Sequence, residues 1–101
     1  MNDDGFDPVI HPLARLRICA LLDPVHHEAF ATVRGLLGFT DSTLSKHIRV
    51  LIDAGYLEPT NAGRSGRRPV TLAMTRAGRE SFHRHIEALN QLAGTPKETN
   101  P

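Results

Sequence analysis

Hydroxyl and cationic side chains are concentrated in one short stretch of this 101-residue chain, residues 39–55. Side chains of these two kinds bind phosphate oxygens and the edges of bases, whereas a carboxylate is repelled by phosphate. The stretch has no carboxylate between Asp41 and Asp53. Its hydroxyl and cationic residues are Thr40, Ser42, Thr43, Ser45, Lys46 and Arg49. We interpret this set as a candidate surface for contact with DNA.

Apolar residues in the same stretch recur at the spacing of a single helix face. They stand at i, i+4, i+7 and i+8, and are Leu44, Ile48, Leu51 and Ile52. Thr40 and Asp41 can cap the free amide groups at a helix start, and Gly55 suits the left-handed conformation that ends many helices. The pattern therefore predicts a DNA recognition helix over residues 42–54, with its polar face turned outward.

A second helix is expected directly before this one, over about residues 28–37. Gly38 ends it, and only a short turn separates it from the recognition helix. Two helices joined by a short turn that contains glycine form a helix-turn-helix.

After the recognition helix, the apolar pattern changes to that of strands. Residues 56–60 are short and extended, and residues 70–74 alternate in the way of a half-buried strand. Residues 61–68 between them predict the tip of a β-hairpin, or wing. The cations expected there are Arg64, Arg67 and Arg68.

The two ends of the chain supply the remaining elements. A first helix is expected over about residues 12–22 and a last one over about residues 76–92. The last helix has two adjacent apolar stripes, which favour packing on a second copy of the chain as well as on the domain itself. We expect an N-terminal arm at residues 1–10, one domain at residues 11–94 and a flexible tail at residues 95–101. The predicted fold class is mainly α with a small β-hairpin.

Composition sets limits on the remaining possibilities. The net charge of +1 does not by itself indicate a nucleic-acid binder, so the placement of the cations matters more than their sum. The one cysteine, Cys19, lies in an apolar helical run and is expected in the core. No apolar run approaches the ~20 residues that span a bilayer, and we expect a cytoplasmic protein. No arrangement of catalytic residues is recognisable, so no enzyme and no cofactor is predicted.

Three segments together make the chain resemble a winged-helix transcriptional regulator of the broad MarR/ArsR type. They are HPLARLRICALL at 11–22, GFTDSTLSKHIRVLIDAGYLE at 38–58 and GRRPVTLAMTRAGRESFHRHI at 66–86. The chain is most similar to the small stand-alone winged helix DNA-binding domain family of bacterial regulators. By this resemblance the recognition-helix residues named above and the three wing arginines match DNA-contacting positions.

The same resemblance implies a homodimer whose interface is formed by the arm, the first helix and the last helix. The residues expected there are Phe6, Ile10, Leu13, Phe82, Ile86, Leu89 and Leu92. The function implied is that of a sequence-specific regulator bound to double-stranded DNA. His47 is expected either to pack at the edge of the recognition helix or to touch a phosphate.

The sequence is also compatible with two functions other than that of a simple DNA-binding regulator. The same helix face could bind a protein partner without touching DNA. The chain could also be a metal- or ligand-responsive DNA-binding sensor, because it has six histidines. No cysteine pair or His-x-x-x-His spacing is present, so no metal ligands are assigned.

Overall fold

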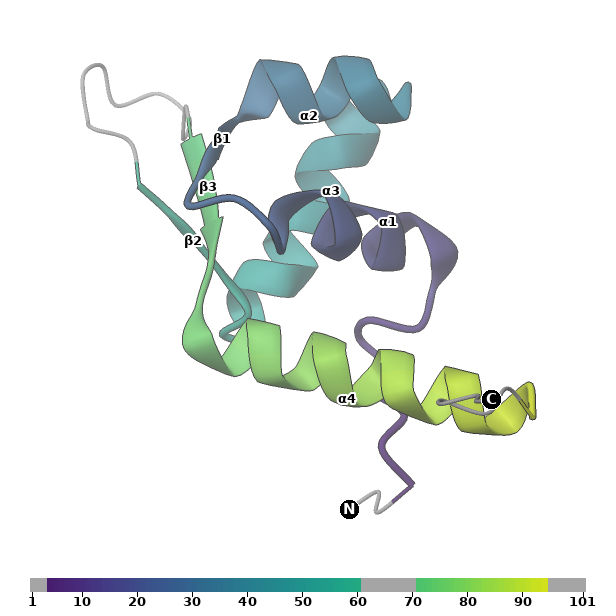
Figure 1. Ribbon diagram of the computed structural model, residues 1–101. Helices are drawn as coiled ribbons and strands as arrows, with labels where there is room; N and C mark the ends of the chain where they lie inside the picture. The colour runs from purple at the N-terminus through teal and green to yellow at the C-terminus, as the bar shows by residue number, and fades with distance from the viewer. Residues whose placement is uncertain (1–3, 61–70, 95–101) are drawn as a thin grey trace.

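Four helices and a small three-stranded sheet make up the part of the protein that its computed structural model describes, residues 4–60 and 71–94. In chain order the elements are α1 (Leu13–Leu22), β1 (Glu28–Ala29), α2 (Phe30–Leu37), α3 (Asp41–Asp53), β2 (Leu57–Pro59), β3 (Thr71–Met74) and α4 (Arg76–Leu92). Helices α1, α2 and α3 gather on one side of α4, and the sheet stands at one end of α4 (Figure 1). The predicted fold class is confirmed. Within the described ranges, no helix combines the length and apolar character needed to cross a membrane.

The sheet has one more strand than the predicted hairpin. Its order is β1-β3-β2, and both pairings are antiparallel. Glu28 lies opposite Leu72, and Ala29 lies opposite Thr71. The prediction of a helix from about residue 28 was therefore wrong at its start, because α2 begins only at Phe30. The free edge of β3 pairs with the backbone of these two residues and holds them extended.

The predicted starts of α3 and α4 and the predicted end of α3 are confirmed. At the start of α3, the Thr40 hydroxyl accepts a hydrogen bond of 3.1 Å from the backbone N–H of Thr43. At the start of α4, the Thr75 hydroxyl accepts one of 3.0 Å from the N–H of Gly78. Gly55 follows α3 with a φ of 83°, a backbone conformation that residues other than glycine rarely adopt. These contacts fix where α3 begins and where the chain turns into β2.

One apolar core joins all four helices to the sheet. Its buried members are Ile10, Ile18, Cys19, Leu22, Phe30, Val33, Leu44, Ile48, Leu51, Leu57, Leu72, Met74 and Phe82. Burial of an apolar side chain of this size contributes about 1.5–3 kcal/mol, so the three from α3 hold that helix firmly in place. Burial, assisted by Asp7 and Asp23, raises the pKa of the Cys19 thiol to about 12. Cys19 therefore stays protonated and packs as a small apolar residue, as predicted.

Polar contacts attach α4 to the loop that follows α1. The Arg79 guanidinium donates to the backbone carbonyl of Asp23 and, at 3.0 Å, to that of Val25. His83 Nε2 lies 2.9 Å from the Asp23 carboxylate. The two Arg79 contacts satisfy the carbonyl of Asp23, which caps the end of α1, and that of Val25 in the loop beyond it.

Candidate nucleic-acid interface

Helix α3 has one buried face and one exposed face, in the division that the sequence predicts. Leu44 and Leu51 are fully buried and Ile48 is 4% exposed. The exposed hydroxyl and cationic side chains on the other face are Ser42, Thr43, Ser45, Lys46 and Arg49, and Val50 and Asp53 are also exposed toward the end of the helix. Thr40, also exposed, caps the helix directly before them. The five polar side chains therefore form one continuous outward surface, which we call the reading face; its contact with DNA stays a prediction.

A tight turn sets the reading face in position relative to α2. Gly38 ends α2 in the left-handed conformation with a φ of 73°, and its N–H donates to the Arg34 carbonyl at 2.9 Å. The Arg34 guanidinium then forms an ion pair with the Asp41 carboxylate at 2.6 Å. The pair ties the end of α2 to the start of α3. It also places a cation against the carboxylate that stands next to the reading face.

The flank of α3 nearest α1 carries an additional polar pair. The Arg15 guanidinium of α1 lies 3.1 Å from His47 Nδ1, and its Nε donates to the Val9 carbonyl at 2.6 Å. Phe39 lies beside the same imidazole, with ring centroids 6.0 Å apart. Burial, and then the charges of Arg15 and Lys46, lower the pKa of His47 below its usual 6.5. His47 is thus a neutral, half-buried ring at the edge of the reading face.

The strands β2 and β3 bring the two ends of the predicted wing together. The Thr60 N–H donates to the Thr71 carbonyl at 3.0 Å, and the two hydroxyls lie 2.5 Å apart. The predicted wing cations Arg64, Arg67 and Arg68 lie outside the described residues, as does the predicted tail at residues 95–101.

The seven residues expected at a dimer interface fall into three groups. Ile10 is fully buried and Phe82 is 7% exposed, so both belong to the core of the chain itself and not to a surface that a second copy can reach. Leu13 and Leu92 are 65% and 73% exposed. The remaining three, which are half-buried, are Phe6, Ile86 and Leu89. An apolar hollow of about 420 Å³ lies between the arm and Leu92.

The arm is attached to α4 by a buried histidine that the sequence reasoning did not single out. His85 is fully buried, and its Nδ1 accepts a hydrogen bond of 2.9 Å from the Asp7 backbone N–H. Its Nε2 lies 3.3 Å from His11 Nδ1. Because Nδ1 accepts, the neutral ring carries its proton on Nε2 and donates it to His11. The apolar stripe that contains His85 therefore faces the arm of the same chain.

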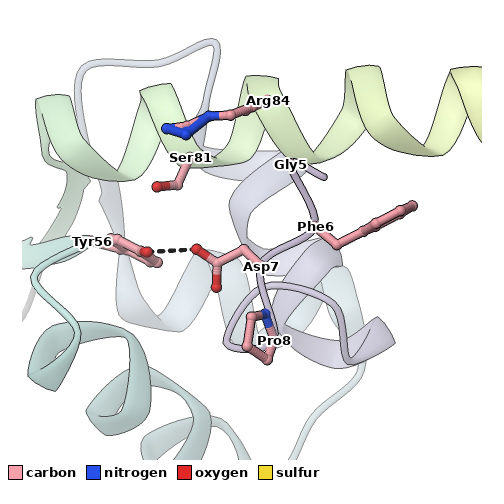
Figure 2. Close-up of a pocket in the computed structure, with 7 residues that line it drawn as sticks. All are labelled: Gly5, Phe6, Asp7, Pro8, Tyr56, Ser81 and Arg84. Carbon is pink, nitrogen blue, oxygen red and sulfur yellow. Dashed lines mark hydrogen bonds between the residues drawn. The ribbon is translucent and has the colours of Figure 1, made fainter. Parts of the chain in front are cut away.

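Tyr56 ties the arm to the end of α3. Its hydroxyl donates to the Asp7 carboxylate at 2.5 Å, on the floor of a hollow of about 680 Å³ (Figure 2). Burial and this hydrogen bond raise the pKa of Tyr56 above its usual 10.0, so the hydroxyl remains a donor at neutral pH. The arm thus contacts both α4 and the segment that follows α3. Among residues 4–60 and 71–94, no group of three or more metal-ligating side chains is placed to hold a metal ion.

The buried imidazole predicts a dependence of stability on pH. Burial, followed by the charge of His11, lowers the pKa of His85 below 6.5 in the folded state. The unfolded chain then binds more protons, so the free energy of unfolding is largest above about pH 6.5 and falls as the pH drops below that value. Urea denaturation at about pH 8 and about pH 5.5 measures the change.

A variant isolates the contribution of His85 to this dependence. In His85→Asn the amide oxygen can replace Nδ1 as acceptor, but it does not titrate. This variant is expected to be less stable at about pH 8 and to lose less stability on acidification than the wild type. His27→Asn, changed at an exposed position, is the matched control. An equal pH dependence in His85→Asn and the wild type would contradict the assignment.

Comparison with known proteins gives three similarities. The family described as winged helix DNA-binding domain matches residues 14–93. An uncharacterized protein of Methanocaldococcus jannaschii, MJ0432, is 27% identical over 85 residues, which are 84% of this chain and 92% of that protein. A solved structure described as a transcriptional regulator homologue from Pyrococcus horikoshii matches with a TM-score of 0.74 and 26% identity, over 85% of each chain. That organism is an archaeon, so the likeness extends beyond bacterial regulators.

Proposed function

The chain belongs to the winged helix DNA-binding domain family, and from that premise we propose that it is a homodimeric regulator of transcription that binds a specific sequence in double-stranded DNA. The observation that carries the proposal is the reading face, which presents hydroxyls and cations from a helix that three buried apolar residues hold in place. The proposal is one of binding without catalysis. A regulator of this kind acts where the DNA is, which for this chain we take to be the cytoplasm.

Helix α3 is proposed to lie in the major groove, which is wide enough to admit a helix and presents a distinct pattern of donors and acceptors for each base pair. Ser42, Thr43, Ser45 and Lys46 occupy its N-terminal half and are proposed to meet base edges and nearby phosphates. Arg49 stands one turn after Ser45 and is proposed to contact either a base edge or a phosphate. These contacts divide into those that specify the sequence and those that position the protein on the backbone.

The wing is proposed to add contacts that do not depend on sequence. Arg64, Arg67 and Arg68 would bind phosphates or enter the minor groove. Each phosphate that a cation neutralises releases counterions, so such contacts make the affinity fall with salt. The pairing of Thr60 with Thr71 supports a wing at this end of the sheet.

Dimerisation is proposed to pair two reading faces through exposed apolar residues of α1 and α4. Leu13 and Leu92, at 65% and 73% exposure, are large apolar side chains that a lone domain leaves in water. With the half-buried Phe6, Ile86 and Leu89, they form the proposed interface. A two-fold dimer reads half-sites about 10 base pairs apart, or a multiple of that spacing.

Selection from a pool of random duplexes tests the proposed function. The full chain is expected to enrich one pseudo-palindrome, whose half-site spacing reports the symmetry of the dimer. Affinity at the background level without any enriched sequence would contradict the proposal and favour a module that binds a protein partner. Repeating the selection with a chelator present asks whether a metal ion takes part.

A further inference from the structure

Arg15 connects three parts of the molecule that lie around the reading face. From α1, its Nε donates to the Val9 carbonyl of the arm at 2.6 Å, and its terminal nitrogen lies 3.1 Å from His47 Nδ1 on α3. A guanidinium has only donors, so the nitrogen of His47 that faces it must accept. Arg15 is half-buried, in contrast to Arg17, which is exposed two positions further on.

The arm residue that accepts from Arg15, Val9, is itself held in place by hydrogen bonds. The Val9 N–H donates to the Asp7 carboxylate at 2.8 Å, and the Asp7 N–H donates to His85 on α4 at 2.9 Å. The Val9 carbonyl therefore belongs to a segment that hydrogen bonds fix from two sides. The Val9 carbonyl is therefore a fixed acceptor, and it orients the planar guanidinium of Arg15 toward His47.

The bond from Arg15 decides which nitrogen of His47 carries the proton. With Nδ1 accepting, the neutral ring must be protonated on Nε2. His47 lies one helical turn after Thr43, which is exposed on the reading face, so its ring stands at the margin of that face. Among residues 4–60 and 71–94, no partner occupies Nε2 of His47.

We propose that Arg15 is a positioning residue for DNA binding, which holds His47 as the neutral tautomer that donates its Nε2 hydrogen to a DNA phosphate. The inference rests on the proposed function and adds a backbone contact at the flank of α3. His47 faces Arg15 from α1 and has Lys46 beside it on its own helix; both charges oppose its protonation. The contact therefore uses a fixed neutral donor at about pH 8, well above the ordinary pKa of a histidine.

Nitrogen-15 NMR of the imidazole ring and DNA affinity together test the proposal. In the wild type, His47 is expected to carry its proton on Nε2 and to titrate below 6.5. In Arg15→Met the ring is expected to populate both tautomers and its pKa to rise, because one of the charges that opposes protonation is gone. DNA affinity at about pH 8 is expected to fall by about twofold from the mixture of tautomers alone, because about half of the rings then lack the Nε2 hydrogen. Complete loss of the hydrogen bond to the phosphate, at about tenfold, is the upper limit of the effect.

Salt and pH profiles separate positioning from direct contact. If Arg15 acts through His47, Arg15→Met leaves the slope of affinity against salt unchanged and makes affinity rise as the pH falls below about 6.5, because a protonated ring attracts phosphate. A slope reduced by about one, with unchanged His47 signals, would show that Arg15 itself binds a phosphate and would overturn the proposal. Arg17→Met is the control and is expected to leave the His47 signals as they are.

Two further measurements keep the test decisive if Arg15→Met does not fold. Arg15→Lys retains a cation but has its donors on a single nitrogen, and it is expected to keep part of the preference for Nε2 protonation. A proton on Nδ1 of His47 in the wild type would overturn the proposal without any variant. Failure of the wild type to bind any selected duplex would instead contradict the proposed function, while the ring signals would still report on the bond between Arg15 and His47.

Discussion

Reversing both charges on the reading face, Lys46→Glu with Arg49→Glu, is expected to lower the affinity for the selected duplex by at least about 100-fold. One lost base or phosphate contact by such a cation costs about 1–3 kcal/mol, and the new carboxylates add repulsion from phosphate. Both side chains are exposed, and neither forms an ion pair with another described residue. The fold should therefore survive the change, which circular dichroism and thermal unfolding would verify.

A matched variant controls for the change in overall charge. Arg17→Glu with Arg76→Glu alters the net charge equally, at two exposed positions that lie on α1 and α4. Fluorescence anisotropy with the selected duplex at several salt concentrations is the measurement. We expect the control to lose only the part of the affinity that follows from net charge. Equal losses in the two variants would mean that α3 has no special part in binding.

Replacing Gly78 with alanine is expected to destabilise the fold by about 2–4 kcal/mol. A glycine inside a helix usually gains about 0.5–1 kcal/mol when it becomes alanine. At Gly78, however, the added Cβ would lie 2.3 Å from the Tyr56 carbonyl oxygen and 3.0 Å from its carbonyl carbon. These are backbone atoms of the segment between α3 and β2, so they cannot move aside as a flexible side chain would. Overpacking of this severity outweighs the gain in helix propensity.

The same substitution at Gly35 is the natural comparison. Gly35 lies within α2, and a Cβ there would meet nothing within 4 Å. Gly35→Ala is expected to raise the free energy of unfolding by about 0.5–1 kcal/mol. Urea denaturation of the two variants at one pH measures both changes. Opposite signs are expected, and a neutral or stabilising Gly78→Ala would show that α4 does not approach Tyr56 as closely as described.

Helix α3 was predictable from the sequence because local rules determine it. Its apolar face follows the helical period, its start has a capping threonine, and its end has a glycine in the left-handed conformation. Each of these signals lies within a few residues of the feature that it predicts. The turn between α2 and α3 and the cap of α4 were predictable for the same reason.

Features that depend on distant partners were not predictable in this way. The sequence predicts a helix start at Glu28 and Ala29, but their pairing with β3 holds them in an extended conformation. His85 lies in an apolar helical stripe, which indicates burial, but its partner Asp7 is 78 residues away in the chain. A buried histidine with an acceptor nitrogen needs such a donor, and the sequence does not identify which residue supplies it.

The residues expected at the dimer interface also show that the sequence does not identify distant partners. Ile10 and Phe82 were expected at an interface because the family resemblance implies one formed by the arm, the first helix and the last helix. The arm instead folds back, so that Ile10 enters the core of its own chain together with Phe82. An apolar pattern predicts that a side chain is covered, but it does not say which surface covers it.

Backbone amide NMR with the selected duplex tests most directly whether the outward side of α3 meets DNA. Titration of the full chain should shift the amide signals of Ser42, Thr43, Ser45, Lys46 and Arg49 more than those of α4. Shifts confined to the arm and α4, with those five amides unmoved at saturation, would contradict the claim.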